Sequence, residues 1–305
     1  MASDLTVEKD LHHHHDEENE HDQELWQGGE EPFKAGYGKL MMWYFLVSDA
    51  FTFAGFLIAY GTLRFSMPTW PVPDFVFQAF PGGFHHSPLI FVTLMTFILI
   101  VSSVTMVRGV QEGHRGNKDG VVFWMLLTIV GGAAFLGCQA WEWTTLIQGE
   151  NVSITRNPFG RHELAGTYTQ NEEGEDYKAG QQAETFKQGQ GYLLEPVKNE
   201  ETKEIEYTEA GKMKFIQRKF IAEDGQKGEL KEGPFQFGAL FFFITGFHGF
   251  HVLSGVVFLA IIMLNAASGL YHRRGNHYEM VEKIGLYWHF VDLVWVFVFL
   301  VFYLL

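Results

Sequence analysis

Residues 237–266 read "FGALFFFITGFHGFHVLSGVVFLAIIMLNA" and contain no Asp, Glu, Lys or Arg, but they hold two histidines three positions apart. A helix needs about 20 apolar residues to cross a bilayer, so this stretch predicts a membrane span. His248 and His251 would then lie in hydrocarbon. Such imidazoles hold a metal or haem, carry protons, or fix one helix against another.

Four further apolar stretches predict spans of the same kind. In lipid the backbone must satisfy its own hydrogen bonds, which favours helices. A soluble helical core is disfavoured, because five such runs would leave no polar face for water. The sequence therefore predicts an all-α integral membrane protein with five transmembrane helices, at about 40–63, 88–108, 121–147, 237–266 and 284–305.

The charged residues are concentrated outside these spans. Of the net charge of −14, residues 1–39 contribute −8, residues 150–235 contribute −5, and the rest of the chain −1. The remainder is nearly uncharged and aromatic, as membrane spans are. The acidic balance argues against nucleic-acid binding.

Basic residues in the short connections predict the orientation, because cytoplasmic loops carry an excess of Lys and Arg. The 64–87 connection has only Arg64, and it would lie on the opposite side. We predict the N-terminus inside and the C-terminus outside. The basic residues that indicate the cytoplasmic side are Lys34, Lys39, Arg108, Arg115, Lys118, Arg273, Arg274 and Lys283.

Two polar segments flank or interrupt the spans. Residues 1–39 form an acidic tail with the run "HHHH", for which a disordered cytoplasmic segment is favoured over a metal site. Residues 161–233 would form a periplasmic insertion. Its stretch "KEIEYTEAGKMKFIQRKF" (203–220) suggests a hairpin around "EAGK", so both a small module with β-hairpins and a flexible loop remain open.

Three acids fall inside predicted spans, where charges are costly and usually functional or paired. Asp49 lies about 14 Å into the first span, near mid-bilayer, where it either exchanges protons or hydrogen-bonds a neighbouring helix. For Glu142, near the outer end of its span, a structural hydrogen bond is favoured. Asp292 follows His289 by one helical turn, so these two are expected to form a satisfied polar pair.

Packing is also favoured over ligation for His248 and His251, because two histidines without a nearby carboxylate make a poor zinc set. A bis-histidine haem would need a ligand on another helix, and His289 could face His251. Small residues predict close helix contacts at Ala133 and Gly137, and also at Gly246, Gly249 and Gly255.

Four motifs, in order, resemble subunit III of the haem–copper oxidases, the cytochrome c and quinol oxidase family. They are "WYFLVSDAFTFAGFLIAYG" (43–61), "CQAWEW" (138–143), "TGFHGFHV" (245–252) and "YWHFVDLVWVFVFLVFY" (287–303). The resemblance covers roughly 40–160 and 234–305.

This resemblance implies a subunit with no catalytic centre, no cofactor and no metal of its own. It implies haem and copper in partner subunits, contact with the catalytic and other oxidase subunits, bound phospholipid, and support of proton uptake. Asp49 stands at the position of the family's intramembrane Glu, whose side chain is one methylene longer. The other residues that match family positions are Glu142, His248, His251, His289 and Asp292.

The chain departs from the family pattern in two further ways. Five spans in place of seven imply a bacterial form in the inner membrane, lacking the family's first two helices. The stretches "NPFG" (157–160) and "GPFQFG" (233–238) resemble the two ends of one short family loop, opened by the insertion. We expect the insertion to contact a neighbouring respiratory complex or a cytochrome.

Two other functions remain as alternatives. One is a b-type haem or quinone-binding redox protein that uses His248, His251 and His289. The other is a proton transporter that uses Asp49, Glu142 and Asp292.

Overall fold

The computed structural model describes most of the chain, and residues 1–36 of the predicted acidic tail (1–39) lie outside the described residues. One compact unit comprises Phe45–Leu305, and the tertiary contacts given below lie within it. The described residues are 37–77, 89–149, 151–178, 180–199, 204–208, 213–274 and 278–304.

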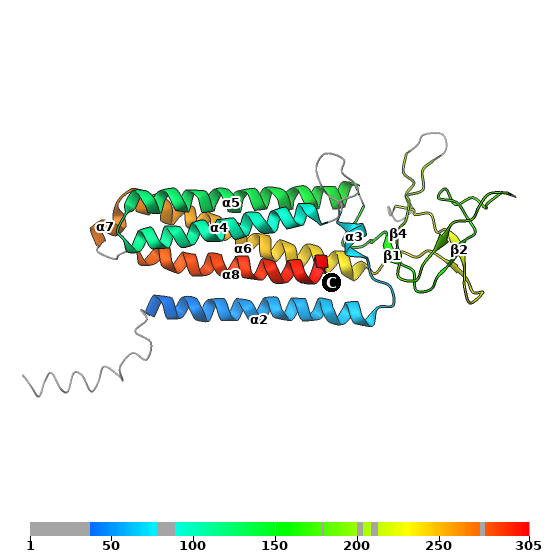
Figure 1. The fold of residues 1–305 in the computed structure, drawn as a ribbon, viewed down its shortest axis with the longest axis horizontal. Helices are drawn as coiled ribbons and strands as arrows, with labels where there is room; N and C mark the ends of the chain where they lie inside the picture. Colours follow the sequence, from blue (N-terminus) through cyan, green and yellow to red (C-terminus); the bar gives the residue numbers. More distant parts are fainter. Residues whose placement is uncertain are drawn as a thin grey trace, which may run out of the picture. The chain divides into compact units, whose positions relative to one another are not determined.

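Five of the described helices are long and apolar enough to cross a membrane, which confirms the predicted fold class. Each covers one predicted span (Figure 1). Two short helices, α3 (Pro73–Val76) and α7 (Leu270–Arg274), lie in connections. The long helices are α2 (Tyr37–Ser66), α4 (Ile90–His114), α5 (Lys118–Thr144, continued by the π-turn η1, Thr145–Gly149), α6 (Phe235–Ala267) and α8 (Glu279–Phe299, continued by η2, Leu300–Leu304).

Four of these helices form a packed group. Helix α4 packs against α5 and α8, and α6 packs against the same two helices. Helix α2 joins mainly through aromatic rings: Phe53 lies 5.2 Å from Phe247 between ring centroids, and Tyr60 lies 4.1 Å from Phe302. Many apolar side chains on the outer faces are exposed, as expected for helices that meet lipid.

Glycines allow the closest helix contacts, although not all at the predicted positions. A Cβ on Gly132 would lie 2.5 Å from a Trp288 ring carbon, and one on Gly249 would lie 2.9 Å from Gln139 Oε1. The predicted contact at Ala133 and Gly137 is wrong. A Cβ on Gly137 would meet nothing within 4 Å, and both residues are on an exposed face.

The segment between α5 and α6 contains short antiparallel strands, so the predicted β-hairpins are present. Strand β1 (Phe159–Arg161) pairs with β4 (Gly191–Leu193). A four-stranded sheet has the order β3 (Thr185–Phe186), β2 (Gly166–Tyr168), β5 (Lys219–Ala222), β6 (Lys227–Glu229). Strands β5 and β6 form a hairpin. The "EAGK" turn itself (209–212) lies outside the described residues, and the antiparallel bridge Tyr207↔Met213 flanks it.

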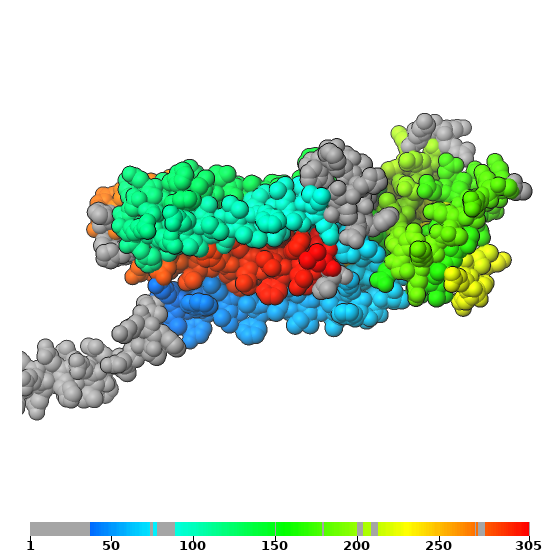
Figure 2. All heavy atoms as spheres, viewed as in Figure 1, coloured from blue at the N-terminus to red at the C-terminus, as the bar shows by residue number. Residues whose placement is uncertain are grey.

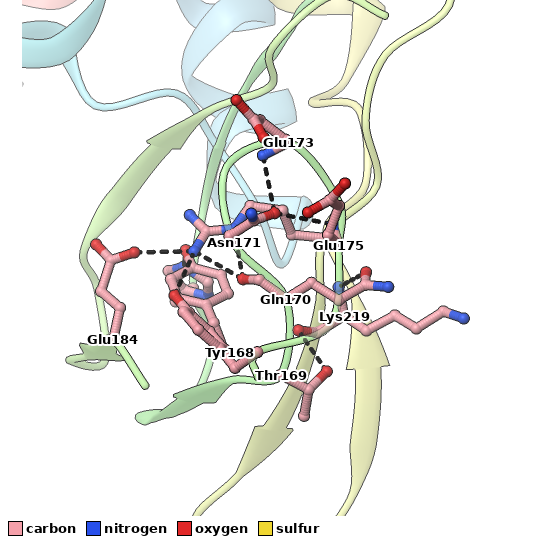
Figure 3. A network of polar contacts seen from close by, with 11 residues as sticks. Tyr168, Thr169, Gln170, Asn171, Glu173, Glu175, Glu184 and Lys219 are labelled. Atoms are coloured by element: carbon pink, nitrogen blue, oxygen red, sulfur yellow. Dashed lines mark hydrogen bonds and ion pairs between the residues drawn. The ribbon is translucent and has the colours of Figure 1, made fainter. Parts of the chain in front are cut away.

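We call residues 159–233 the β module. Its core is a small cluster of Tyr168, Phe186, Tyr192, Leu194 and Leu230. A polar network lies on its surface (Figure 3). There Arg218 stacks over the Tyr168 ring at 3.8 Å, donates to the Gln170 carbonyl and pairs with Glu184 at 2.9 Å.

The two ends of the β module lie side by side where the chain leaves and re-enters the helices. The Gly233 amide donates to the Asn157 carbonyl at 2.8 Å, and the Asn157 carboxamide caps the Phe159 amide at 3.1 Å. A Cβ on Gly233 would collide with the Phe159 carbonyl oxygen, so this crossing requires glycine. The β module is therefore inserted into a connection between α5 and α6 whose two ends are already in contact.

Candidate functional site

The clearest polar contact between helices joins Asp49 of α2 to His251 of α6. His251 Nε2 lies 3.3 Å from Asp49 Oδ2, and the two side chains are only 10% and 17% exposed. Oδ2 has no hydrogen-bond partner among the described residues, so the two atoms are in close polar contact without forming a hydrogen bond. The rings of Phe53 and Phe247 lie edge-on to the imidazole, at 5.4 and 4.7 Å between centroids, and shield it.

The hydrogen bond of His251 fixes which ring nitrogen faces Asp49. Its Nδ1 donates to the Phe247 carbonyl oxygen at 2.8 Å, because a carbonyl oxygen can only accept. Nε2 is therefore the nitrogen that lies against Asp49 Oδ2. A proton placed between Nε2 and Oδ2 would pass from one atom to the other without changing the net charge of the pair.

His248, one turn before His251, contacts different neighbours. Its side chain is fully buried, and Nε2 donates to the Val291 carbonyl of α8 at 3.1 Å. The imidazole lies between the rings of Phe135 and Trp295, with centroids 5.7 and 5.2 Å away. The two histidines therefore face α8 and α2 respectively and do not converge on one point.

Glu142 is buried near the end of α5 and is held by the last turn of the chain. The Tyr303 hydroxyl lies 3.2 and 3.1 Å from its two carboxyl oxygens. This agrees with the favoured structural hydrogen bond. Tyr303 could not be identified as the partner from sequence, because neither spacing nor composition indicates which helix end faces Glu142.

His289 and Asp292 do not form the predicted satisfied pair. His289 Nδ1 lies 2.6 Å from the Ser103 hydroxyl of α4. Neither carboxyl oxygen of Asp292 has a hydrogen-bond partner in the described part of the chain. The spacing puts His289 and Asp292 on one face of α8. His289, however, hydrogen-bonds Ser103, which lies on α4 and is distant in the sequence.

A histidine outside the spans was missed from sequence. His162, in the β module, is 4% exposed, stacks on Phe186 at 3.7 Å between centroids, and bonds the Tyr168 hydroxyl at 2.8 Å. Burial, reinforced by the nearby Arg218, lowers the pKa of His162 to about 4. Burial likewise raises the pKa of Tyr168 to about 12. No motif marks these residues, because the strands around them are too short for a clear pattern.

Within the described ranges, no group of three or more His, Cys, Asp or Glu side chains could hold a metal ion. Five of the six predicted residues form separate contacts between helices: Asp49 with His251, Glu142 with Tyr303, His248 with Val291, and His289 with Ser103. The Asp292 carboxyl oxygens have no hydrogen bond of standard geometry to the described residues. Such an arrangement can position helices and, at Asp49 and His251, hold an exchangeable proton.

Comparison with known proteins connects this geometry to a family. Residues 208–305 match the family model of cytochrome c oxidase subunit III. Over this segment the chain is similar to cytochrome c oxidase subunit III. The subunit III match contains His248, His251, His289 and Asp292, whereas Asp49 and Glu142 precede it.

Individual relatives carry the same name. Proteins named cytochrome c oxidase subunit 3 from Podospora anserina and Neurospora crassa are 48% identical to this chain over 67 and 64 residues. The one from Sus scrofa is 41% identical over 83 residues. These similar segments cover 22%, 21% and 26% of this chain, and 24%, 23% and 31% of the relatives. The chain thus spans less than a third of the length of the subunit III relatives it matches.

Proposed function

We propose that this chain is a non-catalytic subunit III of a bacterial respiratory haem–copper oxidase in the inner membrane. The observation that carries the proposal is the subunit III match over 208–305, a segment that holds two of the five spans. In this role the chain stabilises the catalytic subunit, binds phospholipid on its exposed apolar faces, and supports proton uptake during O₂ reduction. The predicted orientation, with the N-terminus in the cytoplasm, belongs to this proposal.

The histidine contacts support a role without redox chemistry in this chain. His248 Nε2 and His251 Nδ1 are both bonded to backbone carbonyls, and His289 Nδ1 is bonded to a hydroxyl. Each bond occupies only one ring nitrogen, but His248 lies against α8 and His251 against α2, so these two imidazoles do not converge on one metal position. Haem and copper would accordingly reside in the partner subunits.

The contact between Asp49 and His251 is the part of the chain best suited to proton uptake. A proton placed between them can pass from one group to the other in the middle of the bilayer without creating a net charge there. Replacing Asp49 by Asn keeps the shape and can still donate to Nε2, but removes the exchangeable proton. We expect Asp49→Asn to leave the haem content intact and to reduce proton uptake or the stability of turnover.

The experiment is to purify the complex carrying Asp49→Asn and to record haem absorbance, proton uptake and activity over many turnovers. Thr52→Ala, one turn away, is the matched control, because the Thr52 hydroxyl is exposed and bonds only its own helix backbone. Loss of the haem spectrum in Asp49→Asn, or a Soret band from the isolated chain, would contradict the assignment.

The β module is proposed to contact a neighbouring respiratory complex or a cytochrome. Its support is the predicted periplasmic side together with a surface rich in charged residues. Deleting 161–232, which is all of the predicted insertion except Gly233, tests this directly, because Asn157 and the retained Gly233 already lie side by side. Unchanged supercomplex assembly and cytochrome turnover after the deletion would defeat it.

A further inference from the structure

The outer edge of the four-stranded sheet in the β module has unused backbone hydrogen-bonding groups. Strand β6 is the last in the strand order, so β5 is the strand that pairs with it. The Leu230 amide donates to the Arg218 carbonyl at 2.9 Å. Because hydrogen-bonded residues alternate along an antiparallel pair, the amides and carbonyls of Lys227 and Glu229 point away from β5. These groups have no other hydrogen-bond partner in the described part of the chain.

A groove of about 400 Å³ runs along this free edge. One side is formed by residues 226–232, which include β6, and the other by residues 161–164, at the end of β1. The rings of His162, Tyr192 and Phe220 also line the groove, and His162 lies 4.9 and 5.8 Å from the other two between centroids. In Figure 2 the β5–β6 hairpin (yellow) is at the surface of the β module.

The side of the groove opposite β6 also has a free backbone edge. The His162 amide donates to the Gln190 carbonyl at 2.9 Å, in register with the pairing of β1 and β4. By the same alternation, the amide and carbonyl of Arg161 point away from β4, with which β1 forms a two-stranded sheet. Two strand edges with unpaired backbone groups thus border one groove.

The charged side chains of β6 limit the sequence that this groove favours. Lys227 and Glu229 both line the groove and are exposed. They are two residues apart in a strand, so their side chains lie on the same face. A strand paired with β6 would gain from an acidic residue opposite Lys227 and a basic residue opposite Glu229.

The shape of the groove favours a single extended segment as its occupant. Unpaired amides and carbonyls at a strand edge are satisfied by another extended chain, as in peptide recognition by strand addition. The wall at 161–164 closes the other side of the groove. In a second copy of this chain, β6 has the same wall and a sheet behind it, so two copies would collide before their edges met.

We propose that an extended segment of a neighbouring respiratory subunit binds in this groove and adds a strand to the free edge of β6. Its backbone pairs with Lys227 and Glu229, and its side chains on one face enter the groove over the rings of Tyr192 and Phe220. The inference rests on the contact proposed above for the β module. It adds the edge that makes the contact and the chemistry by which the partner is recognised.

The first test uses the intact membrane assembly, with the photo-crosslinking amino acid p-benzoylphenylalanine in place of Leu164. Leu164 lines the groove and is 45% exposed. The matched control carries the probe at Tyr207, which is 58% exposed on the same module and does not line the groove. We expect an adduct with one segment of one respiratory subunit from position 164 and none from position 207.

Two proline substitutions test the strand pairing itself. Glu229→Pro removes an outward amide and keeps the bonds to β5, because proline is tolerated on an edge strand where the amide faces outward. Thr185→Pro makes the same change on β3, at the opposite edge of the sheet, where the Thr185 amide also faces outward. We expect the adduct yield from position 164 to fall by about tenfold in Glu229→Pro, equivalent to about 1.4 kcal/mol, and to persist in Thr185→Pro.

Hydrogen exchange gives a second measurement that needs no substitution in β6. In the unaltered protein, the amides of Lys227 and Glu229 should exchange more slowly in the assembly than in the isolated oxidase, whereas the Thr185 amide should exchange equally in both. In the proline variants, protected amides in β2 and β5 show that the module remains folded. Equal exchange of the β6 amides with and without the partner would overturn the inference.

The remaining outcomes separate the inference from the function on which it rests. Adducts from position 164 only with lipid, only with a second copy of this chain, or with nothing would overturn the inference. If deletion of 161–232 still disrupts supercomplex assembly in those cases, the β module makes its contact through another surface and the proposed function stands. Unchanged assembly and turnover after the deletion would overturn the proposed contact and the inference together.

Discussion

The helical group and the β module use polar side chains in opposite ways. In the helices, several polar contacts join buried residues more than 100 positions apart in the sequence, such as Glu142 and Tyr303. In the β module, a polar network that includes Glu184 lies at the surface, where the Glu184 side chain is 52% exposed (Figure 3). The module also has a small, mainly aromatic core. Polar contacts therefore position helices in the first region, whereas the second depends on its buried rings.

The largest effect is expected from overfilling the contact between α5 and α8. Gly132→Leu forces a side chain into space occupied by the Trp288 ring and Val256, and should destabilise the purified protein by about 3 kcal/mol or more. Gly137→Leu, on an exposed face of the same helix, should change stability by less than about 0.5 kcal/mol. Thermal denaturation in detergent compares them, and equal losses would show that the packing is not as described.

Acidification should loosen the β module before the helices. The pKa of His162 is about 4 in the folded module against 6.5 for a free side chain, so the unfolded state binds the proton first. Stability is fully present above about pH 6.5 and should fall by about 2–3 kcal/mol as the pH drops towards 4.

Hydrogen exchange of amides in β2 and β5 between pH 7 and pH 4.5 measures this effect. His162→Phe preserves the stacking on Phe186 but removes the titrating group, so its pH dependence should be shallower. If the stability of the module fell equally steeply with pH in the two proteins, the loss of stability would be due to its acidic side chains and not to His162.

Removing one polar contact inside the helices should have an intermediate effect. Tyr303→Phe leaves the buried Glu142 carboxyl without its donor and should cost about 1–2 kcal/mol in thermal denaturation. Thr144→Ala, two residues from Glu142, is the control, because that exposed hydroxyl bonds only its own helix. No difference between the variants would mean that Glu142 is satisfied in another way.

The smallest effect is expected from a surface ion pair of the β module. Lys214 and Glu206 lie 3.1 Å apart, with side chains 47% and 36% exposed. Lys214→Ala should change the free energy of unfolding of the module, measured by hydrogen exchange, by less than about 0.5 kcal/mol. Water and salt screen such exposed pairs. A loss above about 1 kcal/mol would contradict the view that its surface contacts matter little.

The sequence predicted the five spans well because long uncharged runs have few structural alternatives. It also indicated which buried residues would be unusual, since ionisable groups such as Asp49 and His251 stand out in hydrocarbon. It could not pair them, because contact between α2 and α6 depends on how the helices assemble. The same limit explains the His289 error, since Ser103 lies on another helix and resembles many other serines.

The glycine errors have a related cause. Small residues four apart allow a close contact, but only the arrangement of the helices decides which of several glycine faces is used. Gly132 meets Trp288, whereas Gly137 points away from the other described helices. In the β module, strands of two to four residues are too short to show an alternating pattern, so only its hairpin content could be predicted.

The adjacent ends of the β module have a practical consequence for engineering the protein. A folded unit whose termini lie close together can replace residues 161–232 without changing the path of α5 or α6, since Gly233 is kept and closes the connection by a backbone hydrogen bond to Asn157. A fluorescent domain or an affinity handle could be carried there. Such a chimaera would report on assembly in living membranes.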